Sequence, residues 1–181
     1  MTDWRGPGSS SARRLRQANE TWSVNRTGDT GPTKREAMAI ISSETLHATS
    51  VAIDGRAVLI EGPSGIGKSD LGLRLIDRGS VLISDDYTLL LRSGDGLIAR
   101  APGTIRGKIE VRGVGIVTMP FAEDVPVAMM VRLGGDIERL PERRVRRIAG
   151  ISLREIGFEP FEASTPIKIE WALRQPEATP A

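Results

Sequence analysis

From Met38 onward the chain alternates short apolar segments with turn residues, and this pattern predicts a domain built largely from β-strands. The segments HATSVAID and RAVLIEG meet at Asp54-Gly55, and an Asp-Gly dipeptide between two apolar runs is typical of a two-residue β-hairpin. Glycine, proline or aspartate also bounds the other candidate strands, which are VLIS, YTLLLR, GLIAR, KIEVRGVGIVTM and VAMMVRL.

One helix is predicted directly after a glycine-rich segment. Leu71, Leu75 and the neighbouring Ile76 have helical spacing, and Gly79 is a typical stop signal at a helix C-terminus. The sequence therefore predicts a helix from about Lys68 to Arg78.

A second helix is predicted near the end of the chain. There, Thr165-Pro166 has the residue types of an N-cap and a first helical position, and IKIEWALR follows. The stretch IERLPERRVRRIAG is ambiguous because Pro141 divides it, and its second part, RRVRRIAG, could form a helical turn or two.

The first 37 residues differ in composition from the rest of the chain. They are rich in Ser, Gly, Thr and Arg, show no sustained periodicity, and cannot bury enough apolar surface to offset the entropy of ordering. We therefore expect a disordered tail over residues 1–37 and one domain over residues 38–181. Either the tail has a role of its own or Met38 is the functional start.

Composition and charge argue against several classes of protein. The formal net charge is +2, but the seven basic and four acidic residues of positions 1–36 account for +3, which leaves −1 for the predicted domain and argues against nucleic-acid binding. The chain has no cysteine, which excludes disulfides and thiolate metal sites. Its apolar runs are far shorter than the ~20 residues that span a membrane. We expect a cytoplasmic protein whose core is aliphatic, since only 4% of the residues are aromatic.

The segment GPSGIGKS fits the phosphate-binding pattern G-x-x-x-x-G-K-S/T at every position. Glycines let backbone N–H groups turn toward phosphates, while Lys68 would reach the β- and γ-phosphate oxygens and Ser69 would ligate Mg²⁺. A candidate strand precedes the loop and a predicted helix follows it, which favours a nucleotide site over a glycine-rich turn that binds nothing. The predicted nucleotide-binding residues are Gly62, Pro63, Ser64, Gly65, Ile66, Gly67, Lys68 and Ser69.

Two consecutive carboxylates, Asp85 and Asp86, end the candidate strand VLIS. A strand–helix–strand crossover would bring them beside the glycine-rich loop, at the carboxyl ends of parallel strands. A carboxylate there can hold Mg²⁺ or accept a proton from an attacking hydroxyl. The alternative is that the pair only caps a turn.

These motifs, together with His47 and the stretch IRGKIEVRGVGIV, resemble the HPr kinase/phosphorylase family, bacterial enzymes that phosphorylate a serine of the sugar-transport phosphocarrier HPr. The last stretch is close to the family's own signature. The resemblance runs from about His47 to Leu173 and covers only the family's C-terminal catalytic domain, as in a short form found in some proteobacteria. It implies an α/β P-loop kinase fold with a β-rich periphery, ATP and Mg²⁺ as cofactors, HPr as the protein partner, and hexameric assembly.

The resemblance also implies roles for individual residues. Asp86 would be the general base of phosphorylation, with Asp85 assisting at the metal. Arg139 would be the counterpart of an arginine that reaches the active site. The implied catalytic residues are Asp86, Lys68, His47 and Arg139, and the implied metal ligands are Ser69, Glu110 and Asp85.

Near the C-terminus the chain departs from the family. Pro166-Ile167-Lys168 resembles the start of a segment tied to dephosphorylation, but IEWAL replaces the basic and glycine positions that follow, which argues against phosphorylase activity.

Other readings stay open on the residues alone. His47 could be a histidine on a strand surface, and Glu110 and Arg112 could form a surface ion pair on one strand face. A kinase for another protein or for a small hydroxyl substrate, and a nucleotide-binding module without transfer activity, are the alternative functions.

Overall fold

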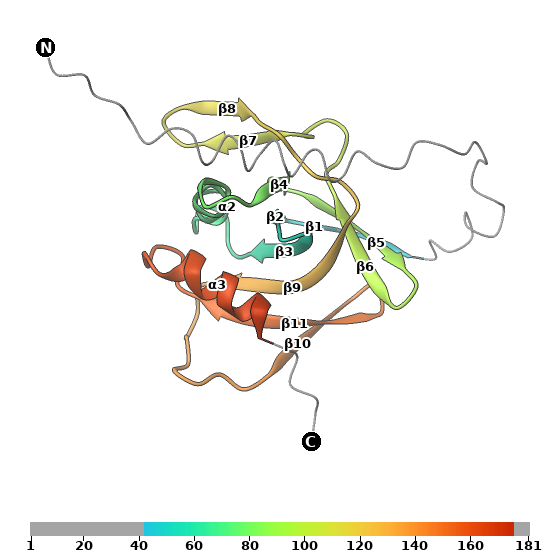
Figure 1. The fold of residues 1–181 in the computed structure, drawn as a ribbon, viewed down its shortest axis with the longest axis vertical. Helices are drawn as coiled ribbons and strands as arrows, with labels where there is room; N and C mark the ends of the chain where they lie inside the picture. The colour runs from blue at the N-terminus through green and yellow to red at the C-terminus, as the bar shows by residue number, and fades with distance from the viewer. Residues whose placement is uncertain (1–41, 176–181) are drawn as a thin grey trace, which may run out of the picture.

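The computed structural model describes residues 42–175, so the predicted tail over residues 1–37 lies outside the described residues. The described part contains two helices and eleven strands (Figure 1). In chain order they are β1 (Ser43–Leu46), β2 (Ala48–Ile53), β3 (Arg56–Glu61), α2 (Lys68–Asp77), β4 (Val81–Ser84), β5 (Thr88–Ser93), β6 (Gly96–Arg100), β7 (Lys108–Val111), β8 (Gly115–Thr118), β9 (Val125–Leu133), β10 (Arg144–Ile148), β11 (Ile151–Phe158) and α3 (Thr165–Arg174).

Nine of these strands form one mixed sheet with the order β1-β5-β6-β9-β3-β2-β4, and β11 pairs with β9 and carries β10 at its outer edge. The strands β7 and β8 form a separate hairpin that contacts α2. Figure 1 shows this hairpin near β4 at one end of the molecule and β10 at the opposite end.

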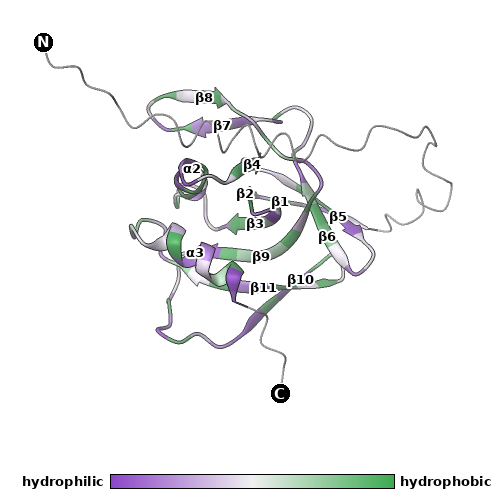
Figure 2. Ribbon diagram, in the orientation of Figure 1, coloured by the Kyte–Doolittle hydropathy of each residue, from purple (hydrophilic) through white to green (hydrophobic). Residues whose placement is uncertain are grey.

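Both faces of the central strands are buried, because their alternate side chains enter two different cores. In β3, Val58 and Ile60 pack under α2 and α3, whereas Ala57 and Leu59 pack toward β5 and β6 on the other face. Figure 2 shows the resulting concentration of hydrophobic residues along β3 and β9. The buried apolar side chains of residues 42–175 are all aliphatic, as the composition predicts.

The strand directions gather the ends of several strands at one edge of the sheet. β3 and β4 both pair antiparallel to β2, so they run parallel to each other with β2 between them. β9 runs parallel to β3, and β11 runs parallel to β9. The carboxyl ends of four strands and the amino end of β2 therefore meet at one edge, and the predicted strand–helix–strand crossover spans the intervening strand β2.

Several local predictions are confirmed. The β2–β3 hairpin turns at Asp54 (φ 49°) and Gly55 (φ 74°), the left-handed pair that a two-residue turn of this kind requires. α2 occupies the predicted span to within a residue. α3 is also present, but its N-cap is Ser164, one residue earlier than predicted. Of the described residues, no helix is long and apolar enough to cross a membrane.

Three local expectations are wrong. The segment RRVRRIAG contains strand β10 rather than helical turns, because its backbone pairs with β11, a strand that the sequence patterns did not indicate. KIEVRGVGIVTM folds back on itself as β7 and β8, with Val111 opposite Gly115. Arg112 consequently lies in the turn of this hairpin and does not share a strand face with Glu110.

Candidate active site

The glycine-rich loop connects the end of β3 to the first residue of α2. Gly65 (φ 77°) and Gly67 (φ 105°) have left-handed backbone conformations, which residues with a Cβ adopt only at a cost of about 1–2 kcal/mol. The backbone N–H of Leu71 donates to the carbonyl of Gly67 (2.9 Å), so the helix begins at the end of the loop. Lys68 crosses back over the loop, and its Nζ donates to the carbonyls of Gly62 (3.0 Å) and Pro63 (3.2 Å).

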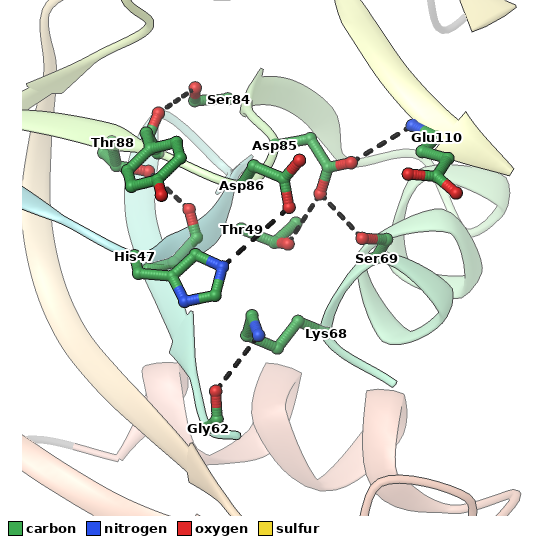
Figure 3. Close-up of polar contacts among 12 residues, drawn as sticks. His47, Thr49, Gly62, Lys68, Ser69, Ser84, Asp85, Asp86, Thr88 and Glu110 are labelled. Atoms are coloured by element: carbon green, nitrogen blue, oxygen red, sulfur yellow. Dashed lines mark hydrogen bonds and ion pairs between the residues drawn. The ribbon is translucent and has the colours of Figure 1, made fainter. Parts of the chain in front are cut away.

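Asp85 is buried behind the loop and joins three elements of the fold (Figure 3). Its Oδ1 accepts hydrogen bonds from Thr49 Oγ1 of β2 (2.7 Å) and from Ser69 Oγ of α2 (2.9 Å). Its Oδ2 accepts one from the backbone N–H of Glu110 in β7 (3.1 Å). With 4% of its surface exposed, Asp85 is a fixed acceptor that positions the serine at the start of the helix.

Asp86 points in a different direction from Asp85. Its left-handed backbone (φ 65°) is part of a tight turn in which Tyr87 N donates to the Asp85 carbonyl (2.8 Å). The Asp86 side chain is 60% exposed, and its Oδ1 lies 4.0 Å from His47 Nε2. The His47 ring also lies beside the Tyr87 ring, with centroids 5.3 Å apart. Two adjacent carboxylates thus have separate environments, one buried and one facing solvent.

A cavity of about 450 Å³ brings the exposed groups together. His47 enters it because β2 begins at the edge where β3 and β4 end. Of the predicted site residues, those that line the cavity are His47, Ser64, Gly65, Gly67, Lys68, Ser69, Asp86 and Glu110.

The other predicted site residues do not line this cavity. Gly62 and Ile66 are partly buried, next to Leu133 and the core cluster under α2, whereas Pro63 is exposed and Asp85 is buried. Arg139 is exposed in the segment between β9 and β10, outside the cavity lining. Its predicted catalytic role stays a prediction.

Sequence reasoning missed several residues of this region, including Thr49 and Phe161. Thr49 holds Asp85, but a buried threonine in a strand carries no sequence signal of its own. Phe161 lines the cavity from the segment between β11 and α3, more than 90 positions beyond the glycine-rich loop. Only the tertiary fold could have identified it.

The oxygen donors of the site fit the chemistry of Mg²⁺. This ion prefers one or two carboxylates together with phosphate and water oxygens. Ser69 Oγ donates to the buried Asp85 carboxylate, and Glu110 lines the cavity that Ser69 also lines. Within residues 42–175 no three Asp, Glu, His or Cys side chains form a metal-binding group by themselves.

A bidentate ion pair fixes α2 against α3 at the end remote from the loop. Arg78 Nε and Nη2 donate to Glu170 Oε1 (2.6 Å) and Oε2 (2.9 Å). The hydrogen bonds from Arg78 lower the pKa of Glu170, against the opposing effect of its partial burial. The same hydrogen bonds raise the pKa of Arg78.

Comparisons with known proteins agree on one family. The family model described as the HPr Serine kinase C-terminal domain matches residues 38–122. An HPr kinase/phosphorylase of Mycoplasmopsis pulmonis is 43% identical over 72 residues, which are 40% of this chain and 23% of that protein. An HPr kinase/phosphorylase of Burkholderia lata is 34% identical over 128 residues, which are 64% of this chain and 40% of that protein.

A solved structure extends the similarity to the fold. The HPr(Ser) kinase/phosphatase from Coxiella burnetii superimposes with a TM-score of 0.64 at 32% identity, over 72% of this chain and 94% of that chain. The mixed sheet with few helices is therefore the fold of the HPr kinase C-terminal domain. The chain spans less than half the length of the curated relatives it matches.

Proposed function

The chain belongs to the HPr kinase/phosphorylase family, and from this we propose that it is an ATP- and Mg²⁺-dependent protein-serine kinase whose acceptor is an HPr-type phosphocarrier. The observation that carries the proposal is the separation of Asp85 from Asp86. The first is buried against Ser69, and the second is free to meet an acceptor in the cavity that Lys68 also lines. A kinase needs both a group that positions the metal end of the phosphates and a base for the acceptor hydroxyl.

In the proposed mechanism the glycine-rich loop binds the phosphates of ATP. Its backbone N–H groups and the positive end of the α2 dipole face the phosphates. Lys68 Nζ gives up its hydrogen bonds to the carbonyls of Gly62 and Pro63 and binds the β- and γ-phosphate oxygens instead. Bound Mg²⁺ would supply positive charge to those oxygens, with Ser69, Asp85 and Glu110 as the residues that would hold it. Asp85 keeps the Ser69 hydroxyl aimed at this position.

Asp86 acts on the acceptor. As the serine oxygen bonds to the γ-phosphorus, its proton passes to the Asp86 carboxylate, and the bond from the γ-phosphorus to the bridging oxygen breaks to release ADP. His47, 4.0 Å from Asp86, orients this carboxylate toward the acceptor. Positioning and electrostatic stabilisation supply most of the acceleration in such a reaction.

The proposed reaction is phosphorylation of the acceptor, without the reverse dephosphorylation. Residues 169–173 replace the positions tied to dephosphorylation in the family, and here Ile169 and Leu173 are buried in the core beneath α3. This part of the helix therefore packs against the sheet. A cytoplasmic location, a hexameric assembly and a role for Arg139 in the assembled site complete the proposal.

The test is a transfer assay with purified HPr and ATP labelled in its γ-phosphate. We expect label on one serine of HPr, identified by mass spectrometry, and no label on HPr in which that serine is replaced by alanine. The Lys68→Ala enzyme serves as the control for transfer by a contaminating kinase. ATP binding without transfer to HPr would contradict the proposed acceptor, and transfer to another substrate would point to a different kinase.

A further inference from the structure

The segment of residues 159–164, between β11 and α3, lies along α2, from Gly67 just before the helix to Arg74 in its last turn. It follows the carboxyl end of β11, one of the four strands that end at the edge of the site. Arg74 of α2 donates hydrogen bonds to the carbonyls of Pro160 and Glu162. Thr165 Oγ1 donates to the carbonyl of Glu159 (2.6 Å). The backbone on both sides of Phe161 is therefore fixed to the helix that begins at the glycine-rich loop.

Phe161 places its ring against the last glycine of that loop. A Cβ added at Gly67 would lie 2.9 Å from Cζ of Phe161, so a larger residue at this position would require the ring to shift. The side chain lines the cavity, yet 69% of the residue is exposed. Among the described residues that line the cavity, Phe161 is the one Phe, Tyr or Trp, and the other ring, His47, belongs to the Asp86 end.

We propose that Phe161 binds the nucleoside part of the nucleotide by stacking its ring on the base. This inference rests on the proposed nucleotide site and adds to it a nucleotide-binding residue outside the glycine-rich loop. Only part of the ring packs against Gly67, and most of it stays exposed beside the phosphate loop, where a base would offer a flat apolar partner. Because every base has such a face, the contact tolerates a change of base.

The test compares three ligands by titration calorimetry in the presence of Mg²⁺. These are ATP, GTP and tripolyphosphate, which has the phosphates without a nucleoside. Alanine substitution at a stacked base costs about 1–3 kcal/mol, so Phe161→Ala should weaken ATP and GTP binding roughly 5- to 150-fold and leave tripolyphosphate affinity unchanged. Phe161→Tyr should retain ATP affinity within about twofold, because it keeps the ring.

A matched control is Trp171→Ala, which removes an exposed aromatic of α3 that does not line the cavity. It should change none of the three affinities. If Phe161→Ala weakens tripolyphosphate as much as ATP, the ring shapes the loop through Gly67 and the stacking proposal is wrong. If no ligand is affected, or if the unmodified protein binds tripolyphosphate and ATP equally, the proposal also fails. None of these results depends on phosphate transfer, so they are distinct from a failure of the proposed kinase activity.

Discussion

Gly72 lets α2 approach β2 closely. Gly72→Ala therefore tests whether the packing of α2 against Thr49 of β2 limits the stability of the protein. Gly72 lies within the helix, where alanine is favoured over glycine by about 1 kcal/mol. A Cβ at this position would, however, lie 2.8 Å from Cγ2 of Thr49, well inside the ~3.5–4.0 Å of an ordinary carbon contact. Helix propensity and packing therefore predict opposite signs for the change in stability.

We expect the packing term to dominate. Thr49 is fully buried, and its hydroxyl is held by Asp85 at 2.7 Å, so rotation away from the new methyl would break a hydrogen bond to a carboxylate. Overpacking costs about 1–3 kcal/mol, and loss of a hydrogen bond to a charged group costs about 1.5–3 kcal/mol. After subtraction of the gain of about 1 kcal/mol from helix propensity, Gly72→Ala should lower the free energy of unfolding by up to about 2 kcal/mol.

The assay is equilibrium urea unfolding at a fixed protein concentration, with Thr49→Ser as the second mutation. Serine lacks Cγ2 but keeps the hydroxyl that donates to Asp85, so the close contact with the new Cβ at position 72 disappears. In the Thr49→Ser background, Gly72→Ala should be neutral or stabilising by up to about 1 kcal/mol. The reasoning is refuted if Gly72→Ala stabilises the original protein, or if it destabilises both backgrounds equally.

Two further predictions concern the scaffold. Glu170→Gln should cost about 0.5–1 kcal/mol at neutral pH by urea unfolding. The Arg78 hydrogen bonds lower the pKa of Glu170 in the folded state. The stabilisation by this ion pair is therefore complete above the ordinary pKa of 4.5 and is lost as the pH falls through the lowered pKa of the folded state. A stability difference between Glu170→Gln and the unmodified protein that persisted in acid would contradict this. Gly55→Ala should destabilise the β2–β3 hairpin by about 1–2 kcal/mol, because alanine is strained at φ 74°, and an unchanged urea midpoint would count against that turn geometry.

Local sequence signals predicted the elements that build the site, because the physics that determines them is local. Asp54-Gly55 suits its turn through left-handed dihedrals, and the glycines at 65 and 67 suit the loop for the same reason. α2 follows from its own apolar spacing and the stop at Gly79, whose N–H caps the Ile76 carbonyl (2.9 Å).

The elements that were missed depend on contacts between distant residues. Arginine has a good helix propensity, yet Arg144–Ile148 is a strand because it pairs with β11, which in turn pairs with β9. Arg146 also forms an ion pair with Glu61 of β3, 85 positions away. Tertiary pairing of this kind overrides local propensity, and no pattern within the segment reveals it.

The different environments of Asp85 and Asp86 could not be predicted from the sequence pattern either. Both are aspartates at the end of one strand, and only the family resemblance assigned a particular role to each of them. The structure supplies a physical basis for a difference, since the left-handed backbone at Asp86 turns its side chain away from the three donors that hold Asp85. The roles themselves stay predictions.

The central claim is that Asp86 transfers the proton while its neighbour serves the phosphate end of the site. The most direct measurement is single-turnover phosphate transfer to HPr by Asp86→Asn, together with calorimetric ATP affinity of the same variant. Asp86 makes no hydrogen bond to the loop and is 60% exposed, so the account predicts ATP affinity close to that of the unmodified protein with transfer abolished. Near-normal transfer by Asp86→Asn would contradict it.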